Sequence, residues 1–150
     1  MIDDLAENAK EELKRADHSL YVTLKYTRTV DVIKNTIKRL ISAFDLAILE
    51  LNEFLKTKKK LKVVPTIAKL RAEIVAEYLS KMKKFIDFYF MLKSIDKAEY
   101  DKKEEYRKNV ALIAFVDVNK PVQVDIETLK GFYRTTAEFV VNVEEIIHQG

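Results

Sequence analysis

The sequence predicts an all-α fold, a mainly antiparallel bundle of five to six helices that forms a single domain over residues 1–150. Its 2 Gly and 2 Pro are too few for a sheet with many hairpin turns. Charged residues make up 34% of the chain and hydrophobic residues 48%, which suits long amphipathic helices. Several stretches also place apolar residues at i, i+3, i+4 and i+7, the spacing of one helix face.

The first helix is expected over residues 4–26, where Asp4 and Glu7 have the spacing of a capping box. A tight connection then leads into a long central helix over residues 29–56. The Thr29 hydroxyl is expected to accept a hydrogen bond from a free amide in the first turn of this helix.

The second half of the central helix, from Phe44 to Leu51, is apolar on most of its circumference. The main stripe of the whole helix contains Ile33, Ile37, Leu40, Ile41, Phe44, Ile48, Leu51 and Leu55. Leu46 and Leu49 point away from that stripe, so a second face of the helix also needs a partner. We favour a helix that the others surround. The alternative is that Leu46 and Leu49 form the seam of a homodimer.

The third helix is expected to begin near Pro65, because Pro favours the first position of a helix. Its expected buried face consists of Ile67, Leu70, Ile74 and Tyr78. A break near Ser80 is expected to precede a fourth helix, which ends near Ile95. This helix supplies the aromatic centre of the core with Phe85, Tyr89 and Phe90.

Residues 102–115 are predicted to form a further helix. Turn-forming residues mark the longest connection, residues 116–124, whose valines alone would form only a marginal hairpin. The last helix is predicted over residues 126–148, with Asp125 as its N-cap. Gly131 inside it costs about 1 kcal/mol relative to Ala. We therefore expect this glycine to allow another helix to pack closely.

Composition and motifs exclude several kinds of site. The chain has no Cys, which excludes disulfides, thiol catalysis and cysteine-ligated zinc. Its two histidines, His18 and His148, are far apart in sequence, and we expect no metal and no cofactor. Two glycines cannot build a phosphate-binding loop. We see no signal peptide and no run of about 18 apolar residues, so we expect a cytoplasmic protein that does not enter the membrane.

The strongest electrostatic feature is the stretch from Lys56 to Lys84, which carries a net charge of +8. Its basic residues are Lys56, Lys58, Lys59, Lys60, Lys62, Lys69, Arg71, Lys81, Lys83 and Lys84. Such a cluster can neutralise the phosphates of RNA or DNA, or bind an acidic protein. A solvated loop and helix face without a partner remains the simpler interpretation.

A second cluster combines aromatic and basic residues: Tyr21, Lys25, Tyr26, Arg28 and Arg39. Aromatic rings and guanidinium groups together can stack on nucleobases. They also pack as buried tyrosine–arginine networks between helices. We favour the buried network for this cluster.

Four segments resemble a family of small uncharacterised archaeal proteins: KYTRTVDVIKNTIKRLISAFDLAI, FIDFYFMLKSI, EEYRKNVALIAF and VDIETLKGFYRTTAEFV. The long helices and the late polar turn before the last helix also resemble HEPN domains. This resemblance implies an α-helical bundle, often dimeric, and in many members a ribonuclease of toxin–antitoxin or defence systems. The HEPN nuclease motif is an Arg and a His separated by four to six residues, and neither Arg107 nor Arg134 is followed by such a His. The resemblance therefore implies a relative without the nuclease motif.

Our leading hypothesis is a non-enzymatic interaction module, a homodimer that binds nucleic acid or a protein partner through the Lys56–Lys84 surface. One alternative is a HEPN-type ribonuclease with a divergent site formed by Tyr106, Arg107 and Asn109. In that site an Arg would stabilise phosphate charge and a Tyr would transfer a proton. Another alternative is a purely structural homo-oligomer.

Overall fold

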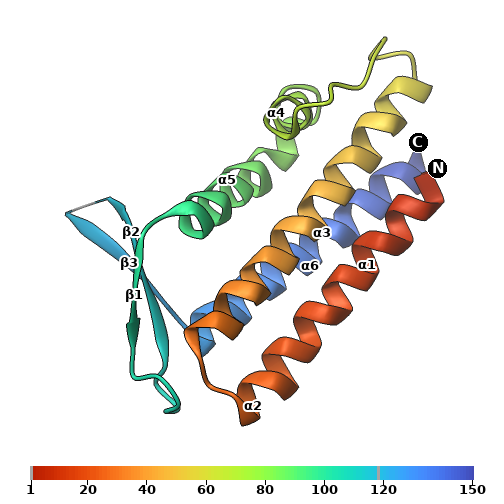
Figure 1. Cartoon of the computed structure of the whole chain (residues 1–150). Helices are drawn as coiled ribbons and strands as arrows, with labels where there is room; N and C mark the ends of the chain where they lie inside the picture. The colour runs from red at the N-terminus through yellow and green to blue at the C-terminus, as the bar shows by residue number, and fades with distance from the viewer. Residues whose placement is uncertain (1, 118) are drawn as a thin grey trace.

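The computed structural model describes residues 2–117 and 119–150. Helices α1, α3 and α6 lie side by side, and α4 and α5 pack on the other side of α3 (Figure 1). The helices are α1 (Ile2–His18), α2 (Leu24–Tyr26), α3 (Val30–Thr57), α4 (Ala68–Tyr78), α5 (Lys83–Lys97) and α6 (Ile126–Gln149). α1 and α5 run opposite to α3, whereas α6 runs in the same direction.

A three-stranded antiparallel sheet stands beside the helices, so the prediction of an all-α fold is wrong. Its strands are β1 (Tyr100–Lys103), β2 (Ala111–Asp117) and β3 (Lys120–Asp125), in the order β1-β2-β3. The helix expected over residues 102–115 is absent from the structure, because those residues end β1, form a turn and build most of β2.

The physical reason is long-range pairing. β2 is hydrogen-bonded on both sides, with Ala114 opposite Tyr100 in β1 and Leu112 opposite Val124 in β3. Leu112 and Ala114 are also fully buried against the helices. Pairing and burial together outweigh the local helix propensity of the segment. They also explain why the β2–β3 hairpin is stable here, since a third strand and a helical layer support it.

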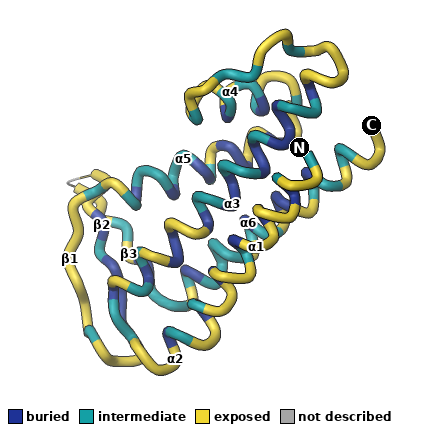
Figure 2. Tube along the Cα trace, turned by 45° about the vertical axis from the view of Figure 1, so that its right-hand side comes forward, coloured by how far each residue is buried: buried dark blue, intermediate teal, exposed yellow. Residues whose placement is uncertain are grey.

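α3 is the centre of the structure, as the sequence predicted. It packs against α1, α4, α5, α6 and β2. Figure 2 shows its buried residues running through the middle of the molecule. Leu46 and Leu49 are half-buried on this helix and belong to neither hydrophobic cluster of the core. Their role in a homodimer seam stays a prediction.

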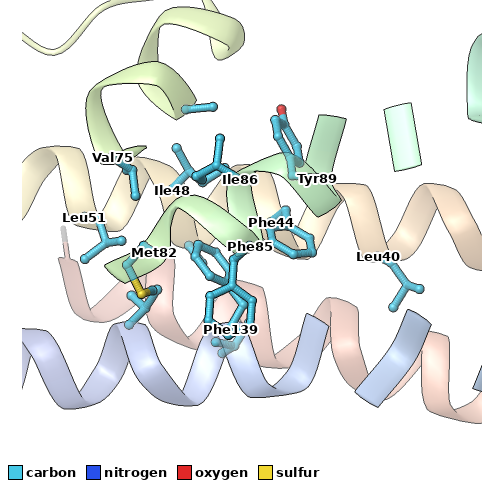
Figure 3. Close-up of a cluster of buried hydrophobic side chains, with 14 of the residues drawn as sticks. Leu40, Phe44, Ile48, Leu51, Val75, Met82, Phe85, Ile86, Tyr89 and Phe139 are labelled. Carbon is cyan, nitrogen blue, oxygen red and sulfur yellow. The ribbon is translucent and has the colours of Figure 1, made fainter. Parts of the chain in front are cut away.

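Aromatic rings from three helices meet in the core, which confirms the aromatic centre expected for α5. The rings of Phe44 on α3 and Phe139 on α6 stack at 4.6 Å, and Phe85 on α5 lies 5.4 Å from Phe139 (Figure 3). Tyr89 on α5 lies 5.5 Å from Phe44. Burial of each of these rings contributes about 1.5–3 kcal/mol to stability.

Two acceptors satisfy the free amides at the start of α3. The Thr29 hydroxyl accepts from the Val32 amide at 3.3 Å, which confirms the predicted N-cap. The Glu105 carboxylate accepts from the Val30 amide at 2.9 Å and adds a negative charge to the positive end of the helix dipole. Glu105 lies in the turn between β1 and β2, so this bond ties the sheet to the helix.

The first helical segment extends from Ile2 to Tyr26, close to the expected residues 4–26, but it is not a regular α-helix throughout. α1 gives way to a π-helical turn, η1 (Ser19–Thr23), which continues into α2. Such turns insert an extra residue into the helix and often occur at functional sites.

The face predicted for the third helix is wrong. Ile67, Leu70 and Tyr78 are exposed, and the residues of α4 that are buried are Ala72 and Val75. A helix of 11 residues carries apolar side chains on more than one face here. Spacing alone could not decide which of these faces meets α3.

α6 begins where predicted. The Asp125 carboxylate accepts from the Thr128 amide at 2.8 Å, which confirms it as the N-cap. This bond lowers the pKa of Asp125. The close approach expected at Gly131 is wrong, because a Cβ placed there would meet no heavy atom within 4 Å.

Replacing Gly131 with Ala is expected to stabilise the fold by about 0.5–1 kcal/mol, because Ala restricts the unfolded chain and finds open space in the helix. Urea unfolding followed by circular dichroism should show a higher midpoint at an unchanged slope. The reverse change on the same helix, Ala137→Gly, is the matched control and should lower the midpoint. A lower midpoint for Gly131→Ala would contradict the open environment.

Candidate functional site

The ten basic residues of the Lys56–Lys84 stretch extend from the last turn of α3 to the first turn of α5, and we call this region the basic end. It comprises the last turn of α3, the following loop, α4, the 3-10 turn η2 (Ser80–Met82) and the first residues of α5. All nine lysines are exposed, and the Arg71 side chain is half-buried. Figure 2 shows the loop as a largely exposed arm above the helices.

The chain leaves α3 through a left-handed residue. Lys59 has a φ of 60°, a conformation that Gly adopts more readily than Lys. The Lys59 amide donates to the Lys56 carbonyl at 3.0 Å, and the Lys60 amide donates to the Leu55 carbonyl at 2.9 Å. These are the two hydrogen bonds of a Schellman motif. The motif fixes a run of three lysines at the tip of the helix despite their mutual repulsion.

Most of these lysines form no ion pair with a carboxylate among the residues that the structure describes. Lys83 pairs with Asp87 at 3.1 Å. The other eight form no ion pair in the described part of the chain. Lys58 instead donates to the Gly150 carbonyl oxygen. The positive charge of the basic end is therefore available to an external anion.

Arg71 has an internal role. Its guanidinium donates to the carbonyl oxygens of Pro65 at 3.1 Å and Thr66 at 2.8 Å, and so holds the loop against α4. The buried Asn52 amide donates to the Arg71 carbonyl at 3.1 Å. We therefore separate Arg71 from the nine lysines as a residue that positions the surface.

The three residues of the alternative catalytic site, Tyr106, Arg107 and Asn109, lie in the turn between β1 and β2, and all three are exposed. Tyr106 is left-handed, with a φ of 68°. Its amide donates to the Arg28 carbonyl at 2.6 Å, which brings this turn against the chain between α2 and α3.

The aromatic cluster is not a buried network, so that prediction is wrong. Tyr21 and Tyr26 are exposed, and Arg28 is half-buried beside them. Arg39 does not join them, because its guanidinium pairs with Glu12 at 3.3 Å. Exposure could not be read from the sequence, since the π-helical turn at Ser19–Thr23 rotates these side chains relative to a regular helix.

The sequence analysis missed a pair of carboxyl groups between α3 and α6. Glu50 is fully buried on α3, and its carboxyl group faces that of Glu144 on α6. Burial first, and then the hydrogen bond and negative charge of Glu144, raise the pKa of Glu50 to about 8. Glu50 is therefore held in its protonated form at neutral pH. A glutamate inside the apolar run from Phe44 to Leu51 was the available signal.

Glu144 also pairs with His148 at 3.3 Å. Both line a groove of about 540 Å³ on α1 and α6, together with Leu13, Val140 and Val141. Glu145 and His148 have the E-x-x-H spacing of a di-iron motif, which the prediction of no metal ligands overlooked. Among the described residues, however, no three His, Asp or Glu side chains are grouped as a metal site.

A second buried polar contact links α3 and α5. The Tyr89 hydroxyl donates to the Asp45 carboxylate. Burial, together with this hydrogen bond, raises the pKa of Tyr89 above its usual range. The contact ties a polar edge of α3 to the aromatic core.

Comparisons with known proteins add no relative to this description. No family model matches the chain, and no similar protein was found among curated proteins or among solved structures. In the described part of the chain, none of the helices has the length and apolarity needed to cross a membrane.

The Glu50–Glu144 pair predicts how stability depends on pH. The unfolded Glu50 carboxyl releases its proton near its ordinary pKa of 4.5, whereas the folded one keeps it up to about pH 8. The free energy of unfolding should therefore fall as the pH rises from about 4.5 to about 8. Glu50→Gln mimics the protonated form and should remove the decrease in the free energy of unfolding that Glu50 causes. At pH 8 the variant should therefore be more stable than the wild type by on the order of 3 kcal/mol.

Urea unfolding of both proteins at several pH values measures the effect. Glu73→Gln, an exposed residue on α4, is the matched control and should follow the wild type. Parallel pH curves for Glu50→Gln and the wild type would show that Glu50 is already ionised in the folded protein.

Proposed function

We propose that this protein is a non-enzymatic module that binds nucleic acid, with the phosphate backbone on its basic end. The observation that carries the proposal is the group of eight exposed lysines without a carboxylate partner in the described part of the chain. Binding a polyanion releases the counterions that condense on it, and this release drives the association.

The residue types favour nucleic acid over an acidic protein. Interfaces between proteins are depleted of Lys and enriched in Arg and aromatic residues at their centre. The basic end carries nine lysines and a single arginine, and Arg71 is engaged with the carbonyl oxygens of its own loop. Flexible ammonium groups suit phosphates whose positions vary with sequence and shape.

The placement of the lysines supports the same function. They extend from the tip of α3 across the loop to α4 and the start of α5, so several can contact successive phosphates. Exposed apolar side chains, those of Val63, Ile67 and Leu70, lie among them and can contact sugars or bases. We expect affinity with little sequence preference, because phosphate contacts carry no sequence information directly.

Salt dependence is the first test. With about five phosphate contacts, the affinity for single-stranded RNA should fall about a hundredfold when the salt concentration rises about fourfold. The variant Lys60→Gln/Lys62→Gln/Lys69→Gln should lower the slope of log K against log[salt] by about 2. Fluorescence anisotropy with a labelled oligonucleotide measures both quantities.

The matched control is Lys14→Gln/Lys97→Gln/Lys120→Gln, which removes three exposed lysines outside the basic end. It should leave the slope near the wild-type value. An equal loss in both triple variants would contradict a localised site. Binding of an acidic polypeptide as tight as that of RNA would favour the protein partner instead.

A further inference from the structure

The opposite end of α3 carries a small cavity with mixed lining. It has a volume of about 220 Å³ and is lined by Tyr21, Lys25, Arg28 and Lys130, together with Leu20 and Leu24. The two leucines are buried, so they form an apolar floor. The cations and the tyrosine ring lie around it. A cavity with this lining suits a ligand that has a planar, partly apolar group and a negative charge next to that group.

Tyr21 lines this cavity and is exposed, and two further exposed tyrosines are joined to its lining through the backbone: Tyr26 follows Lys25, and the Tyr106 amide donates to the Arg28 carbonyl. The exposed fractions are 45% for Tyr21, 80% for Tyr26 and 77% for Tyr106. The Lys130 ammonium lies 5.5 Å from the centre of the Tyr21 ring, so one face of the ring already meets a cation. Aromatic rings left in water at one place are candidates for stacking with an external planar group.

The backbone conformations that position Tyr21 and Tyr106 are uncommon ones that cost free energy. Tyr21 lies in the π-helical turn η1, which the Leu24 amide closes by donating to the Ser19 carbonyl oxygen. Tyr106 is left-handed, a conformation that is uncommon for a bulky side chain. Its amide is anchored on the Arg28 carbonyl. α2 and the turn between β1 and β2 accordingly lie at the same end of the molecule (Figure 1).

The charges around the cavity leave two cations for a ligand. Lys130 pairs with Glu127 at 3.2 Å. Lys25 and Arg28 form no ion pair within the residues that the structure describes. A lysine and an arginine at this spacing along the chain can neutralise one phosphate, with the arginine as a forked donor.

We infer that this cavity is a site for one unpaired nucleobase of a single strand, with the base stacked on Tyr21 and its phosphate on Lys25 and Arg28. The inference rests on the proposed function, because it assumes that nucleic acid is the ligand. It adds a preference for single strands, since a base inside a duplex is already stacked and cannot enter the cavity. Tyr26 and Tyr106 offer stacking surfaces to the neighbouring bases.

The two ends are separate sites. α3 has 28 residues and is therefore about 42 Å long, at about 1.5 Å per residue. The basic end begins at its C-terminal tip, and the cavity lies beside the chain that enters its N-terminus. Substitutions at one end should leave the other end intact.

The test compares a single-stranded RNA with a duplex of the same sequence, in fluorescence anisotropy at constant salt. Tyr21→Ala should weaken binding of the single strand about ten- to hundredfold and leave duplex binding unchanged. Tyr21→Phe keeps the ring and should bind like the wild type. Phe115→Ala is the matched control, because Phe115 is 38% exposed on β2, outside both proposed sites. It should leave the ratio of single-strand to duplex affinity unchanged.

The outcomes separate the two proposals. If Tyr21→Ala binds both RNAs like the wild type while the Lys60/Lys62/Lys69 variant loses both, the cavity is not a base site and the proposed function stands. If the wild type binds neither RNA, both proposals are overturned. If a free nucleoside monophosphate competes as strongly as the single strand, the cavity is a nucleotide site and the inference of a strand is overturned. Unfolding midpoints of all variants establish that each is folded.

Discussion

The burial of α3 in both hydrophobic clusters is the constraint on which the rest of the structure depends. Val30, Ile33 and Ile37 pack with the sheet and with the start of α6. About two to four turns after Ile37, Phe44, Ile48 and Leu51 pack with α4, α5 and the second half of α6. No other helix of the described structure supplies as many fully buried residues. Because one rigid helix takes part in both clusters, the position of every other element follows from which part of α3 it covers.

The burial of α3 also determines where the basic end and the cavity beside α2 lie, since they adjoin the two ends of this helix. The chain leaves α3 through the Schellman motif, which sets Lys59 and Lys60 beyond the last turn. The chain enters α3 at Val30, whose amide is bound by Glu105 from the turn between β1 and β2. The bond from Tyr106 to Arg28 then fixes the same turn beside α2. The turn of the sheet therefore braces the start of α3 and the chain that leads into it.

Local signals in the sequence predicted where α3 and α6 begin. Thr29 and Asp125 act as N-caps because a hydroxyl or carboxylate three residues before a free amide needs no distant partner. The sheet could not be predicted in this way, since β2 gains its stability from β1, β3 and α3. The lysines of the basic end were visible as a run of charge. The facing of Glu50 and Glu144 depends on helix packing across 94 positions of the chain, and the exposure of Tyr21 depends on a π-helical turn. Neither leaves a periodic pattern.

The proposed function places two nucleic-acid surfaces on one helical core, the basic end for phosphates and the cavity beside α2 for a base. An NMR titration of the isotope-labelled protein with a single-stranded RNA long enough to reach both ends tests it most directly. The predicted result is a set of amide shift changes in the loop after Thr57 and in residues 19–28, with only the first set remaining when the RNA is replaced by a short duplex. Shift changes confined to the groove on α1 and α6, or none at all, would contradict the account.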